Sequence, residues 1–129
     1  VLERCNALHL EPTDVEGFEP CGLVVIDLGW TRQAHALPAA RRWLDKGDKS
    51  ARVVTLIKPQ YERERPPGNR RAGAGVLSED ESQRVLTATL DAVQRAGWQV
   101  LDHIKSPIRG GGSRKGKGNV EYLACLSID

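Results

Sequence analysis

The sequence predicts an α/β fold built on a mostly parallel sheet, with an antiparallel pair of strands at one edge. Short apolar runs bounded by turn residues, at 23–26 and 52–58, are typical of strands buried on both faces of a parallel sheet. Two segments with helical spacing of apolar residues alternate with these runs, as in α/β proteins. The last two runs, at 98–105 and 120–128, have no helical segment between them, so we expect them to pair antiparallel.

The first helix is predicted by apolar residues three and four positions apart. They are Leu37, Ala40 and Leu44, with arginines on the opposite side, and this is the period of an amphipathic helix. We expect the helix over residues 33–46, with Gly47 as its stop. The strand before it ends at Asp27.

The second helix has a clear start signal. Ser78 followed three residues later by Glu81 has the form of a capping box, and the acids between them suit the positive end of the helix dipole. Apolar residues at helical spacing continue from there until Gly97. Residues 59–77, rich in Pro, Gly and Arg, are expected to form a long loop before this helix.

The remaining segments complete a single domain over residues 1–129. A glycine-rich basic loop is expected at 106–118, between the last two strands. Val1 and Leu2 resemble the end of a further strand, and the chain contains no methionine. We therefore expect the chain to be a processed or excised piece of a longer polypeptide.

Composition limits the classes of protein that this chain can belong to. It is 40% apolar and 28% charged with a net charge of +2, which indicates a globular domain rather than a polybasic binder. No apolar run is long enough for a membrane span, and residues 1–10 do not have the charged and apolar regions expected of a signal peptide. The three cysteines have no CxxC spacing and the three histidines are scattered, so we expect reduced thiols, a cytoplasmic location and no metal site.

Three charged residues are expected to meet at one edge of the sheet. Asp27 and Lys58 end neighbouring strands, and ligands of open α/β sheets gather beyond the carboxyl ends of strands. Glu121 lies near the start of the last strand, which reaches the same edge if that strand is antiparallel. A structural ion pair between Asp27 and Lys58, with a solvated Glu121, is the alternative interpretation. Convergence of all three would favour a catalytic site.

Basic residues in two loops near this edge suggest contact with an RNA backbone. The first loop contains Arg63, Arg65, Arg70 and Arg71, and the second contains Arg109, Arg114, Lys115 and Lys117. Ordinary solvated loops are the alternative for each residue taken singly. The stretch "GGSRKGKG" nearly matches a phosphate-binding loop, but Gly118 replaces the hydroxyl residue and a strand follows instead of a helix. Nucleotide hydrolysis is therefore not expected.

Several motifs resemble a known family when they are taken in order. They are "LVVIDLGW", "LIKPQYE", "GVL" before an acidic helix start, "SPIRG" and "KGNVEYLACL". This series resembles the FtsJ-like methyltransferases and is most similar to their TlyA (hemolysin A) branch, which carries a similar KPQFE and a closing SPI…GN.E pattern. "VLERCNALHL" also looks like a segment of that branch, so the resemblance covers essentially the whole chain. "DLGW" departs from the serine-phenylalanine usual after this aspartate.

The resemblance implies a Rossmann-like class I methyltransferase fold that binds S-adenosylmethionine and methylates ribose 2′-hydroxyls of RNA, ribosomal RNA in particular. The family uses a Lys-Asp-Lys-Glu tetrad, whose last three members correspond to Asp27, Lys58 and Glu121. Cofactor contacts are implied at Asn6, Asp27 and Leu28. Lys58 would orient the ribose hydroxyl or accept its proton.

The resemblance also implies that part of the methyltransferase domain is missing from this chain. The first lysine of the tetrad, the glycine-rich cofactor loop and the strand after that loop have no counterpart here, so the chain resembles the C-terminal two-thirds of the domain. We expect weak or no cofactor binding by the chain alone, and a bare sheet face covered by self-association or by a missing segment. A methyltransferase domain and a non-catalytic RNA-binding or protein-interaction remnant of that fold both remain open.

Overall fold

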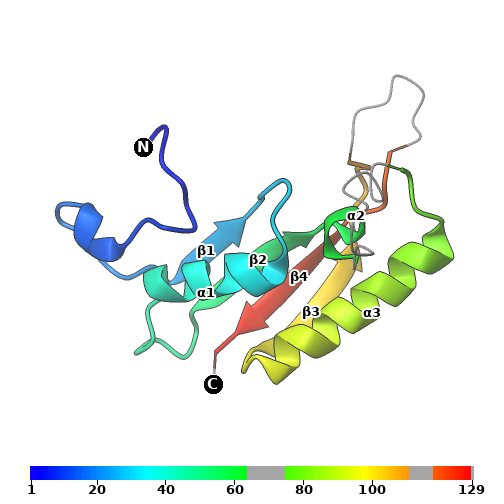
Figure 1. Cartoon of the computed structure of the whole chain (residues 1–129). Helices are drawn as coiled ribbons and strands as arrows, with labels where there is room; N and C mark the ends of the chain where they lie inside the picture. Colours follow the sequence, from blue (N-terminus) through cyan, green and yellow to red (C-terminus); the bar gives the residue numbers. More distant parts are fainter. Residues whose placement is uncertain (64–74, 111–117, 129) are drawn as a thin grey trace.

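The computed structural model describes residues 1–63, 75–110 and 118–128, which form a four-stranded mixed sheet covered by helices. In chain order, the elements of the sheet and its helices are β1 (Leu23–Ile26), α1 (Gln33–Trp43), β2 (Arg52–Ile57), α2 (Pro59–Glu62), α3 (Glu79–Arg95), β3 (Gln99–Lys105) and β4 (Tyr122–Ser127). A short 3₁₀ helix, Pro12–Asp14, precedes them. Figure 1 shows these elements along the chain.

The strands lie in the order β1-β2-β4-β3. β1 and β2 are parallel, whereas β4 is antiparallel to both of its neighbours. The sheet is therefore mixed rather than mostly parallel, because β4 is antiparallel to β2 as well as to β3 and only one pair of strands is parallel. The predicted antiparallel pairing of the last two strands is confirmed.

The second predicted helix is confirmed at both ends. The hydroxyl of Ser78 accepts a hydrogen bond from the backbone N–H of Glu81 at the start of α3. Gly97 follows the helix with a φ of +83°, in the left-handed region that favours glycine.

Three other expectations need correction. The first helix ends at Trp43, before Gly47, because Leu44 is extended and forms a β-bridge with Cys21. The predicted loop at 59–77 begins with the helical turn α2. Val1 and Leu2 are not in a strand.

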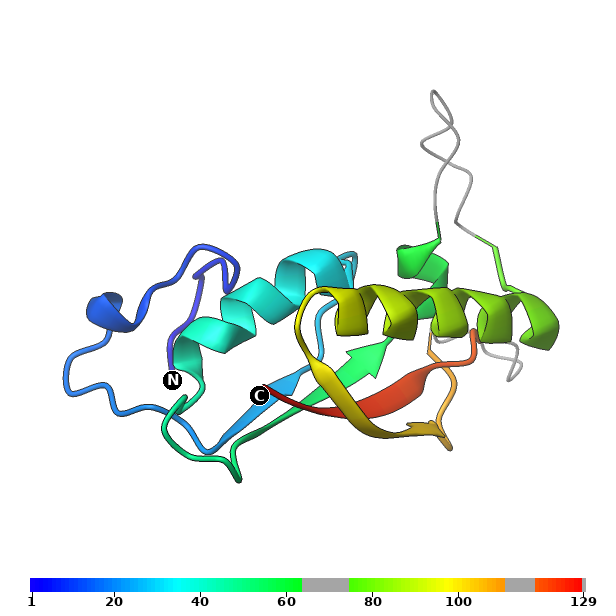
Figure 2. The same ribbon diagram turned by 90° about the horizontal axis from the view of Figure 1, so that it is seen from below.

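The helices pack on one face of the sheet, and the described residues leave the other face open (Figure 2). The core between helices and sheet includes Leu37, Val53, Leu86 and Trp98, each at most 4% exposed. On the opposite face, Val25 is 68% exposed. Burial of β1 on both faces, which its apolar run predicts, is thus not observed in this chain. Across the described ranges, no helix is long and apolar enough to cross a membrane.

Candidate functional site at the carboxyl edge of the sheet

The carboxyl ends of β1 and β2 and the first residue of β4 lie at the same edge of the sheet. Tyr122 of β4 is paired with Ile57 of β2, so Glu121 and Lys58 come one residue beyond this last pair. Asp27 comes directly after β1, which runs parallel to β2. The topology therefore brings Asp27, Lys58 and Glu121 to one edge, as the sequence predicts.

Lys58 and Asp27 form a direct ion pair. Lys58 Nζ donates a hydrogen bond to Asp27 Oδ1 at 2.7 Å. The lysine side chain is 15% exposed and the aspartate side chain is 68% exposed. The ammonium group is thus held in one direction at the rim of the sheet, with an open carboxylate beside it.

Glu121 is 8% exposed and is held by a residue that the sequence prediction did not include. Gln60 Nε2 donates to Glu121 Oε1 at 3.4 Å, and Gln60 is itself 7% exposed. The backbone of Gly110 packs so close to the carboxylate that a Cβ there would overlap it. The solvated alternative for Glu121 is therefore excluded, because its carboxylate is enclosed by a side-chain amide and a glycine.

Glu62, in the same KPQYE segment as Lys58 and Gln60, has a different role. Its Oε1 accepts a hydrogen bond of 2.7 Å from the backbone N–H of Gln33, at the start of α1. The N-cap residue of α1, Arg32, makes no side-chain capping bond, so Glu62 of α2 provides the cap. Burial raises the pKa of the Glu62 carboxyl, opposed by this hydrogen bond and by the positive charge of Arg32.

The five residues Lys58 to Glu62 thus connect α2 to three other elements. Lys58 contacts the end of β1, Gln60 contacts the start of β4, and Glu62 caps α1. Pro59 at the first helical position fixes the backbone from which these alternate side chains project. Strand β2 is followed at once by the charged residue Lys58 because Lys58 is the N-cap residue of the helical turn α2, whose side chains contact β1, β4 and α1 at this edge of the sheet. The spacing of polar residues at 58, 60 and 62 was a signal that could have revealed Gln60.

An aromatic pair joins the two segments that carry the ion pair, since Trp30 follows Asp27 by three residues and Tyr61 follows Lys58 by three. The rings of Trp30 and Tyr61 are 5.1 Å apart between centroids, at an interplanar angle of 32°. Trp30 is 82% exposed and has a φ of +63°, which is unusual for a large non-glycine residue. Such backbone strain is common at functional sites, where surrounding structure maintains it.

Two of the predicted RNA-contacting arginines are already in ion pairs. Arg63 Nη1 lies 2.9 Å from Glu81 Oε1, and Arg109 Nη2 lies 2.7 Å from Glu79 Oε1. Hydrogen bonds from Lys105 and Arg109 lower the pKa of Glu79. The first turn of α3 thus partly neutralises both loops, which the loop sequences alone did not indicate. The other predicted residues lie outside the described residues, namely Arg65, Arg70, Arg71, Arg114, Lys115 and Lys117.

Asn6 and Leu28, the other predicted cofactor contacts, have local roles. Asn6 Oδ1 accepts a hydrogen bond from the backbone N–H of Leu8, and Arg42 near the end of α1 binds the Leu8 carbonyl oxygen at 2.7 Å. This N-terminal segment lies beside the C-terminal end of α1 (Figure 2). The Leu28 side chain packs against the core. No hydrogen bond between described residues joins Asn6 to Asp27. The predicted contact of Asn6 with the cofactor stays a prediction.

The fold and the site define a small α/β domain with a charged, partly buried cluster at the carboxyl edge of a mixed sheet. No family model matches the chain. Hemolysin A from Brachyspira hyodysenteriae is 35% identical over 75 residues, which are 58% of this chain and 28% of that protein. The part of the resemblance that concerns hemolysin A is therefore confirmed as homology.

Two solved structures are similar over nearly the whole chain. A candidate hemolysin from Lactococcus lactis superimposes with a TM-score of 0.76 at 28% identity, covering 99% of this chain and 56% of that one. A candidate hemolysin from Streptococcus thermophilus gives a TM-score of 0.75 at 30% identity, covering 97% of this chain and 42% of that one. The chain spans about half the length of these proteins.

Proposed function

We propose that this chain supplies the catalytic edge of an S-adenosylmethionine-dependent RNA ribose 2′-O-methyltransferase with a Rossmann-like class I fold. The observation that carries the proposal is the Lys58–Asp27 ion pair at the same sheet edge as the buried Glu121. A buried carboxylate and a fixed ammonium at a ligand-binding edge are costly unless they serve a function. Homology to hemolysin A is consistent with this class.

Lys58 is the residue that would act on the ribose hydroxyl. Asp27 fixes the direction of its Nζ at 2.7 Å, and the side chain is still 15% exposed, so a substrate hydroxyl can approach it. The ammonium would donate a hydrogen bond to the hydroxyl oxygen and orient it, and the deprotonated amine would accept the proton lost during attack. Glu121, held by Gln60, would supply a second carboxylate at this edge of the sheet.

The described residues fit one side of a cofactor site. Asp27 presents a 68% exposed carboxylate that can accept hydrogen bonds from the cofactor. Among residues 1–63, 75–110 and 118–128, no glycine-rich loop connects a strand to a helix, so the remaining side is not provided by them. The bound cofactor would contribute an electrophilic methyl group. We expect calorimetric titration of the chain alone with S-adenosylmethionine to show weak or no binding.

The RNA would contact the aromatic pair at the rim. Trp30 exposes an indole face next to Tyr61, and exposed aromatic rings bind unstacked bases of single-stranded RNA. Because Arg63 and Arg109 are paired with glutamates, base stacking is expected to contribute more than these two charges.

The direct test is methyl transfer from labelled S-adenosylmethionine to ribosomal RNA. The assay uses the chain expressed with any coding sequence upstream of Val1, and variants Lys58→Met and Lys49→Met. Loss of the general base and orienting group at Lys58 should lower the rate by about 100-fold or more. Lys49 is exposed in the loop before β2, so its replacement should leave the rate unchanged.

Two results would contradict the proposal. If Lys58→Met transfers methyl groups at an unchanged rate, Lys58 does not take part in methyl transfer. RNA binding without methyl transfer by the wild-type protein would support the non-catalytic RNA-binding remnant instead.

A further inference from the structure

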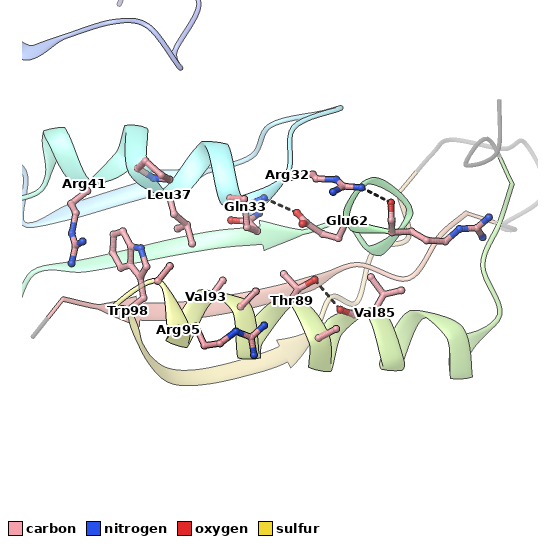
Figure 3. Close-up of a pocket in the computed structure, with 16 residues that line it drawn as sticks. Arg32, Gln33, Leu37, Arg41, Glu62, Val85, Thr89, Val93, Arg95 and Trp98 are labelled. Carbon is pink, nitrogen blue, oxygen red and sulfur yellow. Dashed lines mark hydrogen bonds between the residues drawn. The ribbon is translucent and has the colours of Figure 1, made fainter. Parts of the chain in front are cut away.

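A groove of about 700 Å³ runs between α1 and α3, on the helical side of the sheet (Figure 3). Its floor is apolar and includes Leu37, Val93 and Trp98, which are 2%, 4% and 4% exposed. A volume of this size is within the range of binding pockets. The ion pair and the aromatic pair of the proposed methyl-transfer site are not part of its lining.

The walls of this groove are formed by small side chains. Ala88 and Ala92 lie four residues apart on α3 and Ala96 is its C-cap residue four positions further on, while Ala34 and Pro38 face them from α1. All five are exposed. Since residues four apart lie on one face of a helix, each wall is a smooth apolar strip. Small residues on both walls allow a third helix to approach closely.

The two ends of the groove carry positive charge. Arg32 lies at the end near Glu62 and Arg41 lies at the end formed by Trp98, whereas the Arg95 side chain lies along α3 below Val93 (Figure 3). None of these three arginines forms an ion pair within the described part of the chain, although Arg32 donates a hydrogen bond to the Arg63 carbonyl oxygen and Arg41 donates one to the Gly97 carbonyl oxygen. The one acidic lining residue, Glu62, is engaged with the backbone of Gln33. The groove therefore has an apolar centre, with Arg32 beside the Glu62 carboxylate at one end and Arg41 without an acidic lining residue at the other.

We propose that this groove binds an acidic amphipathic helix of a partner protein. Arg32 and Arg41 are nine residues apart, which is about 13 Å along a helix. A partner helix with an apolar stripe and two carboxylates eight residues apart, which are about 12 Å apart along the helix and on the same side of it, would reach both ends while its stripe covers the floor. A single-chain anionic amphiphile has one head group and would leave one end unmatched. This inference does not depend on the proposed methyltransferase function.

The probe is a synthetic helical peptide of about 18 residues, with leucines along one face and two glutamates about eight residues apart on the same side of the helix. A matched peptide carries lysines in place of both glutamates. Binding is measured by the intrinsic fluorescence of the chain and by amide chemical shifts. The glutamate peptide should bind at least about 10-fold more tightly than the lysine peptide, because like charges repel at both ends. The amide shifts should centre on the Ala88–Ala96 face of α3.

Two variants of the chain complete the test. Arg95→Glu should weaken the glutamate peptide and strengthen the lysine peptide, whereas Lys49→Glu, with the same change in net charge away from the groove, should alter neither. Ala92→Phe should fill the groove and block both peptides. Since Arg95 and Ala92 are exposed, circular dichroism should show both variants folded. Equal affinity for the two peptides, or shifts centred on the open sheet face, would overturn the proposal.

Discussion

The carboxylate of Glu62 lies 2.7 Å from the backbone nitrogen of Gln33 and caps helix α1 from a different helix. The first N–H groups of a helix have no intrahelical partner, and the N-cap residue Arg32 does not satisfy them with its side chain. This hydrogen bond therefore connects the turn that carries Lys58 to α1. A substitution of Glu62 should lower the free energy of unfolding of the chain.

We predict that Glu62→Ala lowers the free energy of unfolding by about 1 kcal/mol, as for loss of other helix caps. Glu62→Gln keeps a side-chain oxygen that can accept the Gln33 N–H and should lose less. Urea unfolding followed by circular dichroism measures both. If Ala and Gln variants are equally destabilised, the capping hydrogen bond is not the source of the effect.

A second prediction concerns how the stabilities of the wild-type chain and of Glu62→Gln depend on pH. Burial raises the folded-state pKa of Glu62 above its ordinary value of 4.5, so its favourable contribution is present at low pH and is lost as pH rises through the raised pKa. Glutamine does not titrate. The stability of Glu62→Gln relative to wild type should therefore increase on going from pH 4 to neutral pH, measured by unfolding at each pH; a constant difference would contradict the raised pKa.

The enclosure of Glu121 is tested at Gly110. A Cβ at this position would overlap the Glu121 carboxylate, so Gly110→Ala should destabilise the chain by about 1–3 kcal/mol. Gly29→Ala is the matched control, since nothing lies within 4 Å of a Cβ there. The control should be neutral or slightly stabilising, by up to about 1 kcal/mol. Thermal unfolding compares the two, and equal melting temperatures would mean that Glu121 can move away freely.

Local signals in the sequence predicted individual elements better than their arrangement. The capping box at Ser78 was recognisable because both of its partners lie within three residues. The end of α1 was not, because the bridge between Leu44 and Cys21 joins positions far apart in the chain. The antiparallel pairing of β4 with β2 was not predicted for the same reason, since apolar runs do not reveal which neighbours a strand has in the sheet.

The candidate site divides in the same way. Asp27, Lys58 and Glu121 could be placed at one edge from strand order and direction alone. The partners that hold them could not, because Gln60 reaches Glu121 across 61 positions and Glu79 neutralises Arg109 across 30. Contacts of this kind depend on side-chain directions in the folded chain, which no spacing rule in the sequence fixes.

At Trp30 we predict that a glycine substitution is no less stable than an alanine substitution, which is the reverse of the usual order. Its φ of +63° costs a residue with a Cβ about 1–2 kcal/mol, a cost that glycine avoids. We therefore expect Trp30→Gly to be at least as stable as Trp30→Ala, although glycine is normally the weaker of the two. Both should reduce affinity for single-stranded RNA about 10-fold by removing the stacking face. Chemical denaturation and fluorescence anisotropy with labelled RNA measure the two effects, and unchanged RNA affinity would exclude Trp30 from the interface.

The open face of the sheet should make the chain associate with itself. Leu23, Val25 and Ile104 are 55%, 68% and 56% exposed, and exposed apolar surface of this kind on a sheet favours association. Val25→Lys places a charge on this face and should weaken self-association about 10-fold or more, because an unpaired ammonium would have to be buried in the interface. Val76→Lys changes an exposed valine outside the sheet and should have no effect. Sedimentation velocity over a range of concentrations measures both. A wild-type chain that stays monomeric and does not bind a hydrophobic dye would show that this face is compatible with solvent.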